Sequence, residues 1–282
     1  QRKWVRTMFR TMVSDRVLQY LEQHPDSFSR NGRKMQATIL FSDLARFTTL
    51  SEHMPPEQVS RLLNHYHSPM TEIVLQRDGY LDKYVGDLIM AVWGVPFATE
   101  DHALQACLAA LEQQRRLAEL APEFHALFGC ELSMRIGINT GTVTAGNMGS
   151  ERRFQYTVVG DPVNLASRLE QAGKLYGVPI LVGERTRLDA GDAIEARLLD
   201  RILVAGKSIP VDVYELIGEK GTMSPARAEF VRLYEEALHA YWQRQWLPAR
   251  RALEQARQRI PADPALELLA RRIAHFESCP PP

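Results

Sequence analysis

Two short apolar segments joined by Gly86-Asp87 constrain the fold of this chain more than any other part of the sequence. Residues 80–85 and 88–94 are rich in the aliphatic and aromatic side chains that strands favour, and Gly-Asp is a dipeptide that accommodates a tight two-residue turn. The pattern predicts an antiparallel hairpin with Asp87 at its tip.

Other predicted strands and helices alternate irregularly on both sides of this hairpin. Residues 36–42 are β-rich, and residues 55–76 have a helical pattern that opens on two prolines. Further strands are predicted at 132–138, 142–147, 154–159, 178–182, 195–204 and 210–217, and further helices at 100–120 and 162–176. This order is neither doubly wound nor all-β. It predicts an α+β fold with helices packed on a mostly antiparallel sheet.

The segments that flank this core are predicted to be helical. Residues 1–24 carry a narrow apolar stripe at helical spacing, and a polar linker follows Pro25. After Gly221 the sequence predicts helices at 224–243, 247–260 and 263–276. We therefore expect three parts, which are an N-terminal connector helix with its linker (1–33), an α+β domain (34–220) and a helical tail (221–282). For residues 1–24, a helix packed on its own domain is the alternative to a connector.

The composition excludes several classes of protein. The chain has 282 residues with 34 basic and 34 acidic side chains, so it carries no net electrostatic signature of nucleic-acid binding, and we expect no such partner. The longest apolar run, residues 88–95, is far shorter than the ~20 residues of a membrane-spanning helix. The three cysteines are scattered, which fits a reducing compartment and predicts a cytoplasmic location.

Two aspartates lie where strands end. Asp43 closes a buried-looking strand and Asp87 occupies the hairpin tip, and a carboxylate in such a place is costly unless it is paired or bound to a metal. Carboxylates on adjacent strands would form the oxygen site that a magnesium-dependent nucleotide enzyme needs. The alternative is purely structural, with Asp43 capping a turn and Asp87 shaping the hairpin.

Three further polar residues have two interpretations each. Asn164 and Arg168 are four residues apart on a predicted helix, so the amide and the guanidinium can converge on one phosphate group, although a solvated helix face has the same spacing. Lys83 lies in the first strand of the hairpin and is either a ligand-binding group or a charge that protects a sheet edge.

The segments that carry these residues resemble class III nucleotide cyclases. They are FSDLARFTTLSE (41–52), DGYLDKYVGDLIMAVWG (78–94), MRIGINTGTVTAGNMGS (134–150) and YTVVGDPVNLASRLE (156–170). The resemblance covers about residues 34–217 and implies a ferredoxin-like α+β domain. It also implies a head-to-tail homodimer, with active sites built between the two subunits.

The resemblance implies a role for each matching position. Asp43 and Asp87 are expected to hold two Mg²⁺ or Mn²⁺ ions that bind the triphosphate of ATP and activate the ribose 3′-hydroxyl. The backbone of Phe47 and Thr48 is expected to wrap the phosphates, and Lys207 to bind phosphate from the last hairpin.

The base-reading and transition-state residues are expected to come from the other subunit. Lys83 and Thr157 resemble the pair that reads adenine, whereas guanylyl cyclases of the family carry Glu and Cys in those places. Asn164 is expected to orient the ribose and Arg168 to stabilise charge at the α-phosphate.

Two positions depart from the family pattern. The family usually has glycine where this chain has Arg46, and it often has a first lysine of the last hairpin where this chain has Ala205. The side chain of Arg46 either obstructs the phosphate turn or adds a positive group to it. With Ala205 in place, phosphate binding by the hairpin rests on Lys207 alone.

The resemblance, with the residues that carry it, implies an adenylyl cyclase that converts ATP to 3′,5′-cyclic AMP and pyrophosphate. Because the sequence starts with Gln1, we also expect an upstream sensory region, and this chain would then be the cytoplasmic portion of a membrane-anchored protein or a soluble one. The tail resembles one tetratricopeptide-like helical hairpin, which is expected to pack on the cyclase domain or on its dimer partner. The alternatives are guanylyl or mixed specificity, and a non-catalytic nucleotide-sensing module with a partner-binding tail.

Overall fold

The computed structural model describes Gln23 and residues 32–150, 154–203 and 210–279. The predicted helix at 1–24 lies outside these residues except for Gln23, and Ala205 and Lys207 lie wholly outside them. The predictions made for those positions are therefore untested.

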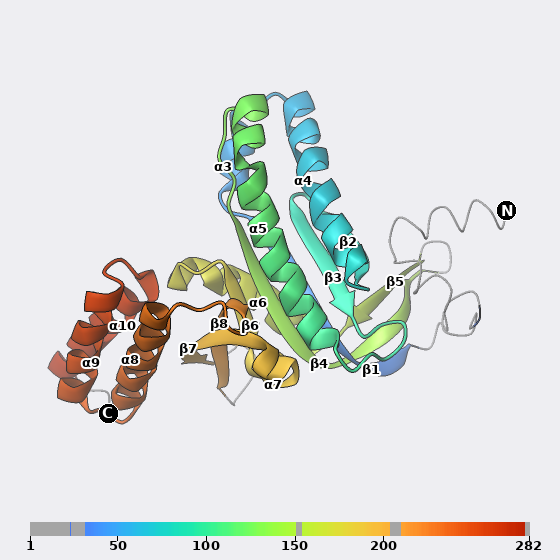
Figure 1. The fold of residues 1–282 in the computed structure, drawn as a ribbon. Coiled ribbons are helices and arrows are strands. Elements are labelled where there is room, and N and C mark those ends of the chain that lie inside the picture. Colours follow the sequence, from blue (N-terminus) through green and yellow to red (C-terminus); the bar gives the residue numbers. More distant parts are fainter. Residues whose placement is uncertain (1–22, 24–31, 151–153, 204–209, 280–282) are drawn as a thin grey trace.

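Within the described ranges, eight strands form one sheet in the order β2-β3-β1-β4-β6-β8-β7, and β5 pairs with the far half of β4 (Figure 1). The strands are β1 (Arg33–Leu44), β2 (Tyr80–Val85), β3 (Leu88–Trp93), β4 (Met134–Gly149), β5 (Phe154–Val159), β6 (Ile180–Gly183), β7 (Ile194–Ile202) and β8 (Val211–Glu219). The β4–β6 pair is parallel and the other pairs of the sheet are antiparallel. The predicted α+β class with a mostly antiparallel sheet is confirmed.

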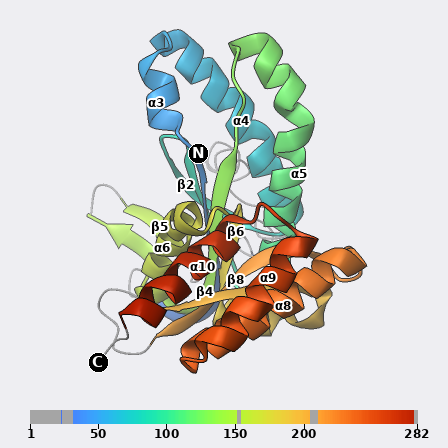
Figure 2. The ribbon, with the colours of Figure 1, turned by 90° about the vertical axis from the view of Figure 1, so that its left-hand side faces the viewer.

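Helices cover both faces of this sheet. They are α3 (Phe47–Glu52), α4 (Pro56–Gln76), α5 (His102–Phe128), α6 (Asp161–Tyr176), α7 (Glu184–Ala190), the 3₁₀ turn η2 (Gly191–Ala193), α8 (Pro225–Trp242), α9 (Trp246–Arg259) and α10 (Pro264–Ser278). Helices α4 and α5 lie side by side and project beyond the sheet (Figures 1 and 2). None of the helices in the described ranges is both long and apolar enough to cross a membrane.

Two of the buried clusters hold α4, α5 and part of α6 to the sheet. On one face, Tyr66 and Met70 of α4 and Phe124 of α5 pack against strand residues such as Leu40. On the other face, Ala166 of α6 packs in a separate apolar cluster with residues of the central strands and β5. The central strand β1 is thereby buried on both sides, which fixes the position of its C-terminal end.

The sequence predicts two strands on either side of Thr140-Gly141, whereas the structure has a single strand there, β4. It is continuous from Met134 to Gly149 and pairs with β1 over much of its length, with Gly141 opposite Ala37. A Cβ atom at Gly141 would lie 2.6 Å from Cγ of Pro162, which is on α6. This glycine therefore permits the close approach of a helix and does not make a turn.

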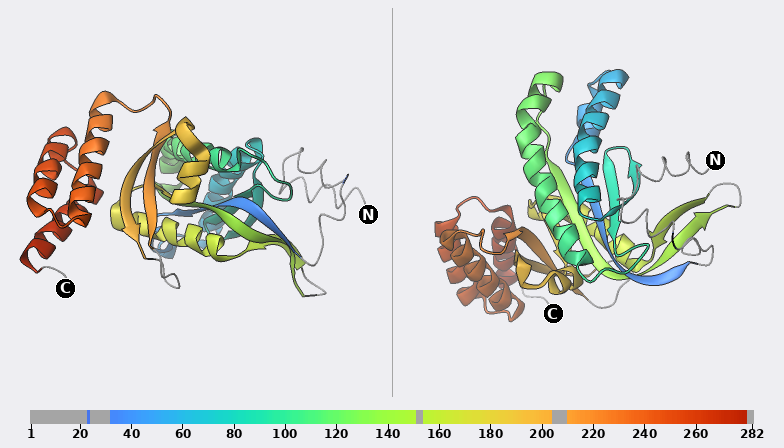
Figure 3. Two further views of the ribbon diagram at one scale, coloured as in Figure 1. Left: turned by 90° about the horizontal axis from the view of Figure 1, so that it is seen from below. Right: turned by 45° about the vertical axis from the view of Figure 1, so that its right-hand side comes forward.

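The helical tail shares a buried core with the sheet, on the side of β7 and β8 (Figure 3, left). The Arg197 side chain of β7 is fully buried, and its Nη2 atom lies 2.8 Å from Glu215 Oε2 and 3.0 Å from Asp263 Oδ2, at the N-cap of α10. Tyr234 of α8 packs against the Arg197 guanidinium and donates a hydrogen bond of 2.9 Å to the Leu199 carbonyl. The domain boundary at residue 220 and the likeness of the tail to a tetratricopeptide hairpin stay predictions.

Candidate active site

The two predicted metal ligands, Asp43 and Asp87, meet at one end of the sheet. The register of β1 with β3 places Ser42 opposite Ile89, so Asp43 lies beside the turn that carries Asp87. The two side chains interact directly, and Asp87 Oδ2 accepts a hydrogen bond of 3.1 Å from the Leu44 amide. Two carboxylates that are 44 positions apart in the sequence thus share one site.

Asp43, Asp87 and their charged neighbours together carry an excess of negative charge. Burial, together with the nearby Asp87 and Glu170, raises the pKa of Asp43 to about 7, although Arg135 opposes the shift. The Arg135 Nη2 atom lies 3.8 Å from Asp43 Oδ2, while its Nε atom donates to Glu170 Oε1 at 3.0 Å. Converging carboxylate oxygens that repel each other are the donor set that a hard divalent cation prefers.

The residues present therefore fit an Mg²⁺ or Mn²⁺ ion for which the protein supplies only some of the ligands. Across the described ranges, no group of three or more His, Cys, Asp and Glu side chains is arranged to hold a metal. Asp43 and Asp87 would thus need oxygen ligands from elsewhere, which a triphosphate or backbone carbonyls can supply.

The raised pKa of Asp43 predicts a pH-dependent cost to folding in the absence of metal. Between the ordinary pKa of 3.8 and about 7, the folded state keeps a proton that the unfolded state has lost, so stability from this group falls as the pH rises through that window. Asp43→Asn should therefore be more stable than the wild type at pH 8, and this advantage should shrink towards pH 5. Urea unfolding with a chelator present measures it. The exposed Asp192→Asn is the matched control, and an equal pH dependence of both variants would contradict the prediction.

The predicted phosphate-wrapping turn follows Asp43 directly. Arg46 has a φ angle of 63°, in the left-handed region that favours glycine, and its side chain is exposed. Phe47 and Thr48 then begin α3, with Phe47 packed against the core and Thr48 exposed. Because Arg46 stands where the family usually has glycine and keeps a conformation that favours glycine, its backbone is strained. The Arg46 side chain is not buried in the turn.

Lys83 and Thr157, predicted to read the base, are brought together by two different strands. Gln155 of β5 donates a hydrogen bond of 2.6 Å to the Asp82 carbonyl of β2, and Tyr80 donates one of 2.7 Å to the Tyr156 carbonyl. The Lys83 Nζ atom lies 3.1 Å from Asp82 Oδ2, and Thr157 is also close enough to Asp82 to affect its pKa. Sequence reasoning missed Asp82, whose only signal was a carboxylate inside an apolar strand beside a lysine.

Asn164 and Arg168 both lie in the N-terminal half of α6. Asn164 is exposed and Arg168 half-buried. Glu170 on the same helix holds Arg135, which in turn faces Asp43, so α6 is linked to the carboxylate pair through an ion-pair chain. Sequence reasoning also missed this chain, although the charged residue inside the segment MRIGIN was its visible signal.

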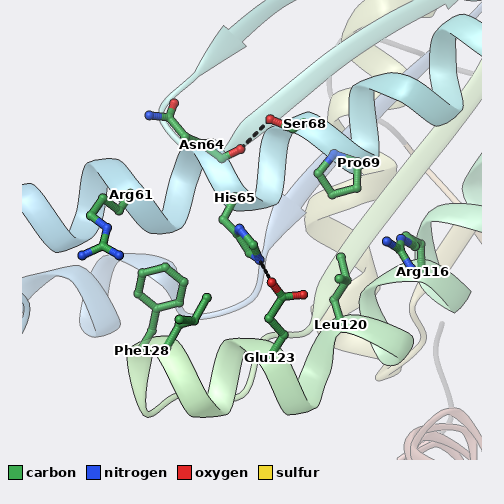
Figure 4. A pocket seen from close by; sticks show the side chains of 10 residues that line it. Arg61, Asn64, His65, Ser68, Pro69, Arg116, Leu120, Glu123 and Phe128 are labelled. Atoms are coloured by element: carbon green, nitrogen blue, oxygen red, sulfur yellow. Dashed lines mark hydrogen bonds and ion pairs between the residues drawn. The ribbon is translucent and has the colours of Figure 1, made fainter.

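A separate hollow lies between α4 and α5, away from these residues. Its lining includes Arg61, Leu120 and Phe128, together with a pair in which His65 Nε2 lies 3.0 Å from Glu123 Oε1 (Figure 4). None of the residues predicted to bind nucleotide or metal lines this hollow. The candidate site is the strand-end cluster.

The comparisons with known proteins show which family this fold belongs to. Residues 30–218 match the model of the adenylate and guanylate cyclase catalytic domain, so the chain belongs to this family. Adenylate cyclase 1 of Rhizobium meliloti is 36% identical over 185 residues, which cover 66% of this chain and 28% of that protein. The adenylate cyclase of Anabaena cylindrica is 37% identical over 186 residues, covering 64% of this chain and 36% of that protein. The chain therefore spans about a third of the length of these curated relatives.

Two solved structures have this fold, and one is named as a guanylyl cyclase and the other as an adenylyl cyclase. The guanylyl cyclase Cya2 is 35% identical with a TM-score of 0.63, over 68% of this chain and 97% of that one. The adenylyl cyclase CyaB from P. aeruginosa is 34% identical with a TM-score of 0.63, over 68% of this chain and 98% of that one. Overall similarity thus does not separate the two activities, and the choice between them rests on the residues of the site.

Proposed function

We propose that this chain is the catalytic part of an adenylyl cyclase, which forms 3′,5′-cyclic AMP and pyrophosphate from ATP in a homodimer. The observation that carries the proposal is that Lys83 and Thr157 both lie close to the same buried carboxylate, Asp82. Adenine offers an acceptor at N1 and a donor at its 6-amino group, and a lysine with a threonine hydroxyl matches that pair. Guanine offers a donor at N1 and an acceptor at O6, which this pair matches less well.

The remaining residues suit an in-line displacement at the α-phosphorus. The 3′-oxygen forms the new bond, the bond from phosphorus to the bridging oxygen breaks, and pyrophosphate leaves. Asp43 and Asp87 would hold the divalent cations, and Arg168 would neutralise charge that develops on the α-phosphate. Asn164 would orient the ribose. When bound, the cations would supply charge neutralisation on the triphosphate and a lowered pKa for the 3′-hydroxyl.

The homodimer completes the proposal, because family resemblance assigns the carboxylates and the other groups of one active site to different subunits. A monomer would then hold two incomplete half-sites, and activity would depend on association.

The nucleotide assay tests this function directly. The purified chain with Mg²⁺ or Mn²⁺ should form cyclic AMP from ATP at least about tenfold faster than cyclic GMP from GTP, judged by kcat/KM, because the base-reading pair discriminates between the two bases. Specific activity should also rise with protein concentration as dimers form.

The alternatives give different results in the same assay. Faster formation of cyclic GMP would favour a guanylyl cyclase. This alternative is considered because the similar structure of Cya2 is that of a guanylyl cyclase. No metal-dependent turnover at any protein concentration would favour a non-catalytic nucleotide-binding module.

A further inference from the structure

Asp82 is a fully buried carboxylate between the two residues proposed to read the base. Its side chain has an exposed fraction of 0%, whereas its neighbour Lys83 is 38% exposed. The ladder between β2 and β3 shifts register between Leu81 and Lys83, so Asp82 lies in a bulge. Successive side chains of a strand normally point to opposite faces, and a bulge changes that direction. Here the bulge allows Asp82 Oδ2 to lie 3.1 Å from the ammonium of its own neighbour.

The hydrogen-bonding capacity around Asp82 is not fully used. Among the described residues, neither carboxylate oxygen of Asp82 accepts a hydrogen bond of ordinary geometry, and the buried Thr157 hydroxyl also makes none. Burial raises the pKa of Asp82, and Thr157 and Lys83 lower it, as groups that donate to a carboxylate do. A buried carboxylate with so few partners is expensive, which points to a function beyond packing.

We propose that Asp82 is a positioning residue that fixes the hydrogen-bond polarity of Thr157 and the place of the Lys83 ammonium, and that it thereby selects a 6-amino purine. This inference rests on the proposed function of the site.

The selection follows from what a carboxylate can do. An ionised carboxylate only accepts hydrogen bonds, so a Thr157 hydroxyl that turns its proton towards Asp82 leaves its oxygen as an acceptor. That acceptor matches the 6-amino group of adenine and opposes O6 of guanine. The same carboxylate holds the ammonium of Lys83, which leaves its other protons for N1 of the base.

The test compares Asp82→Asn with the wild type. Asparagine keeps the size of the side chain but can also donate, so Thr157 becomes free to donate to O6 of guanine. The ratio of kcat/KM for ATP to that for GTP should fall by about tenfold, mainly through a higher KM for ATP. In a Thr157→Val background, where there is no hydroxyl to orient, the further change in this ratio on adding Asp82→Asn should be within about twofold.

Asp200→Asn is the matched control for the loss of a buried carboxylate. Asp200 accepts hydrogen bonds from Tyr176 and Arg272 on the side of the tail, away from the base-reading pair. This variant should lower the melting temperature and leave the ATP/GTP ratio unchanged. If Asp82→Asn lowers kcat/KM for ATP and for GTP by the same factor, as is expected of Asp200→Asn, then Asp82 is merely structural and the inference is overturned.

A second measurement does not depend on turnover. Acetylation of Lys83 by acetic anhydride, read by peptide mass spectrometry against the exposed Lys34 and Lys174, should be slowed more by the α,β-methylene analogue of ATP than by that of GTP. In Asp82→Asn the two analogues should protect Lys83 equally, while overall acetylation of Lys83 increases. Preferential protection by the ATP analogue that persists in Asp82→Asn would overturn the inference. An inactive wild type that still shows this Asp82-dependent protection would instead reject only the proposed cyclase activity.

Discussion

Replacing Asp43 by asparagine should lower cyclic AMP formation by about a thousandfold or more without unfolding the protein, because the change removes a charge that we propose holds a divalent cation. Asp43 and Asp87 converge at the end of the sheet, and burial is the main reason that the pKa of Asp43 is raised to about 7. The Asp43 carboxylate therefore lowers the stability of the folded, metal-free protein, although it would contribute to catalysis. We expect the loss of activity to accompany an unchanged or higher melting temperature when metal is absent.

Binding of Mn²⁺, followed by electron paramagnetic resonance in the presence of an ATP analogue, gives a readout independent of turnover. Asp43→Asn and Asp87→Asn should both weaken it, whereas the exposed Asp192→Asn should match the wild type. Retention of more than about a tenth of the activity by Asp43→Asn would show that the carboxylate pair is not the metal site.

Mixing two inactive variants should restore about a quarter of wild-type activity if each active site draws on both subunits. The variants are Asp43→Asn, which alters the half-site proposed to hold metal, and Arg168→Ala, which alters the half-site proposed to stabilise charge on the α-phosphate. Random reassociation makes about half of the dimers mixed. Each mixed dimer has one site with both lesions and one site with neither.

The control for this experiment uses two lesions in the same half-site. Asp43→Asn mixed with Asp87→Asn should restore nothing, because each site then lacks one carboxylate whichever chains combine. No rescue in the first mixture, with dimers present by analytical ultracentrifugation, would reject the shared site. Arg168→Ala alone should lower kcat far more than it raises KM, since the proposed contact of Arg168 with the α-phosphate would be made mainly in the transition state.

The parts of the fold that local sequence patterns determine could be predicted. Gly86-Asp87 between two apolar runs predicted the β2–β3 hairpin, and the helical period of residues 55–76 predicted α4, whose Tyr66, Met70 and Val74 are buried. Both signals are local, because they depend on turn chemistry and on one buried helix face.

The parts that depend on contacts between distant segments could not be predicted. Gly141 has the sequence signature of a turn, and only the packing of Pro162 against it explains a glycine inside a continuous strand. Short helix α7 has few apolar positions and no period long enough to recognise. The sequence pattern placed Asp43 and Asp87 on adjacent strands, but the bulge that directs Asp82 towards Lys83 depends on how β2 pairs with β3. The two-residue turn fixes the register at the hairpin tip, but no local pattern in the sequence marks the bulge at Asp82.

Strand β1 is hydrogen-bonded to β3 on one side and to β4 on the other over residues 38–42, immediately before Asp43. Amide protons in such a doubly bonded, buried segment exchange with solvent only in the rarest and most extensive openings of a protein. Lys83 and Thr157, by contrast, lie on β2 and β5, which have no second strand partner within the described part of the sheet. Partial opening would therefore release the groups proposed to recognise the base first. A frayed molecule would lose its proposed discrimination between purines while Asp43 was still held by the strands on both sides of β1.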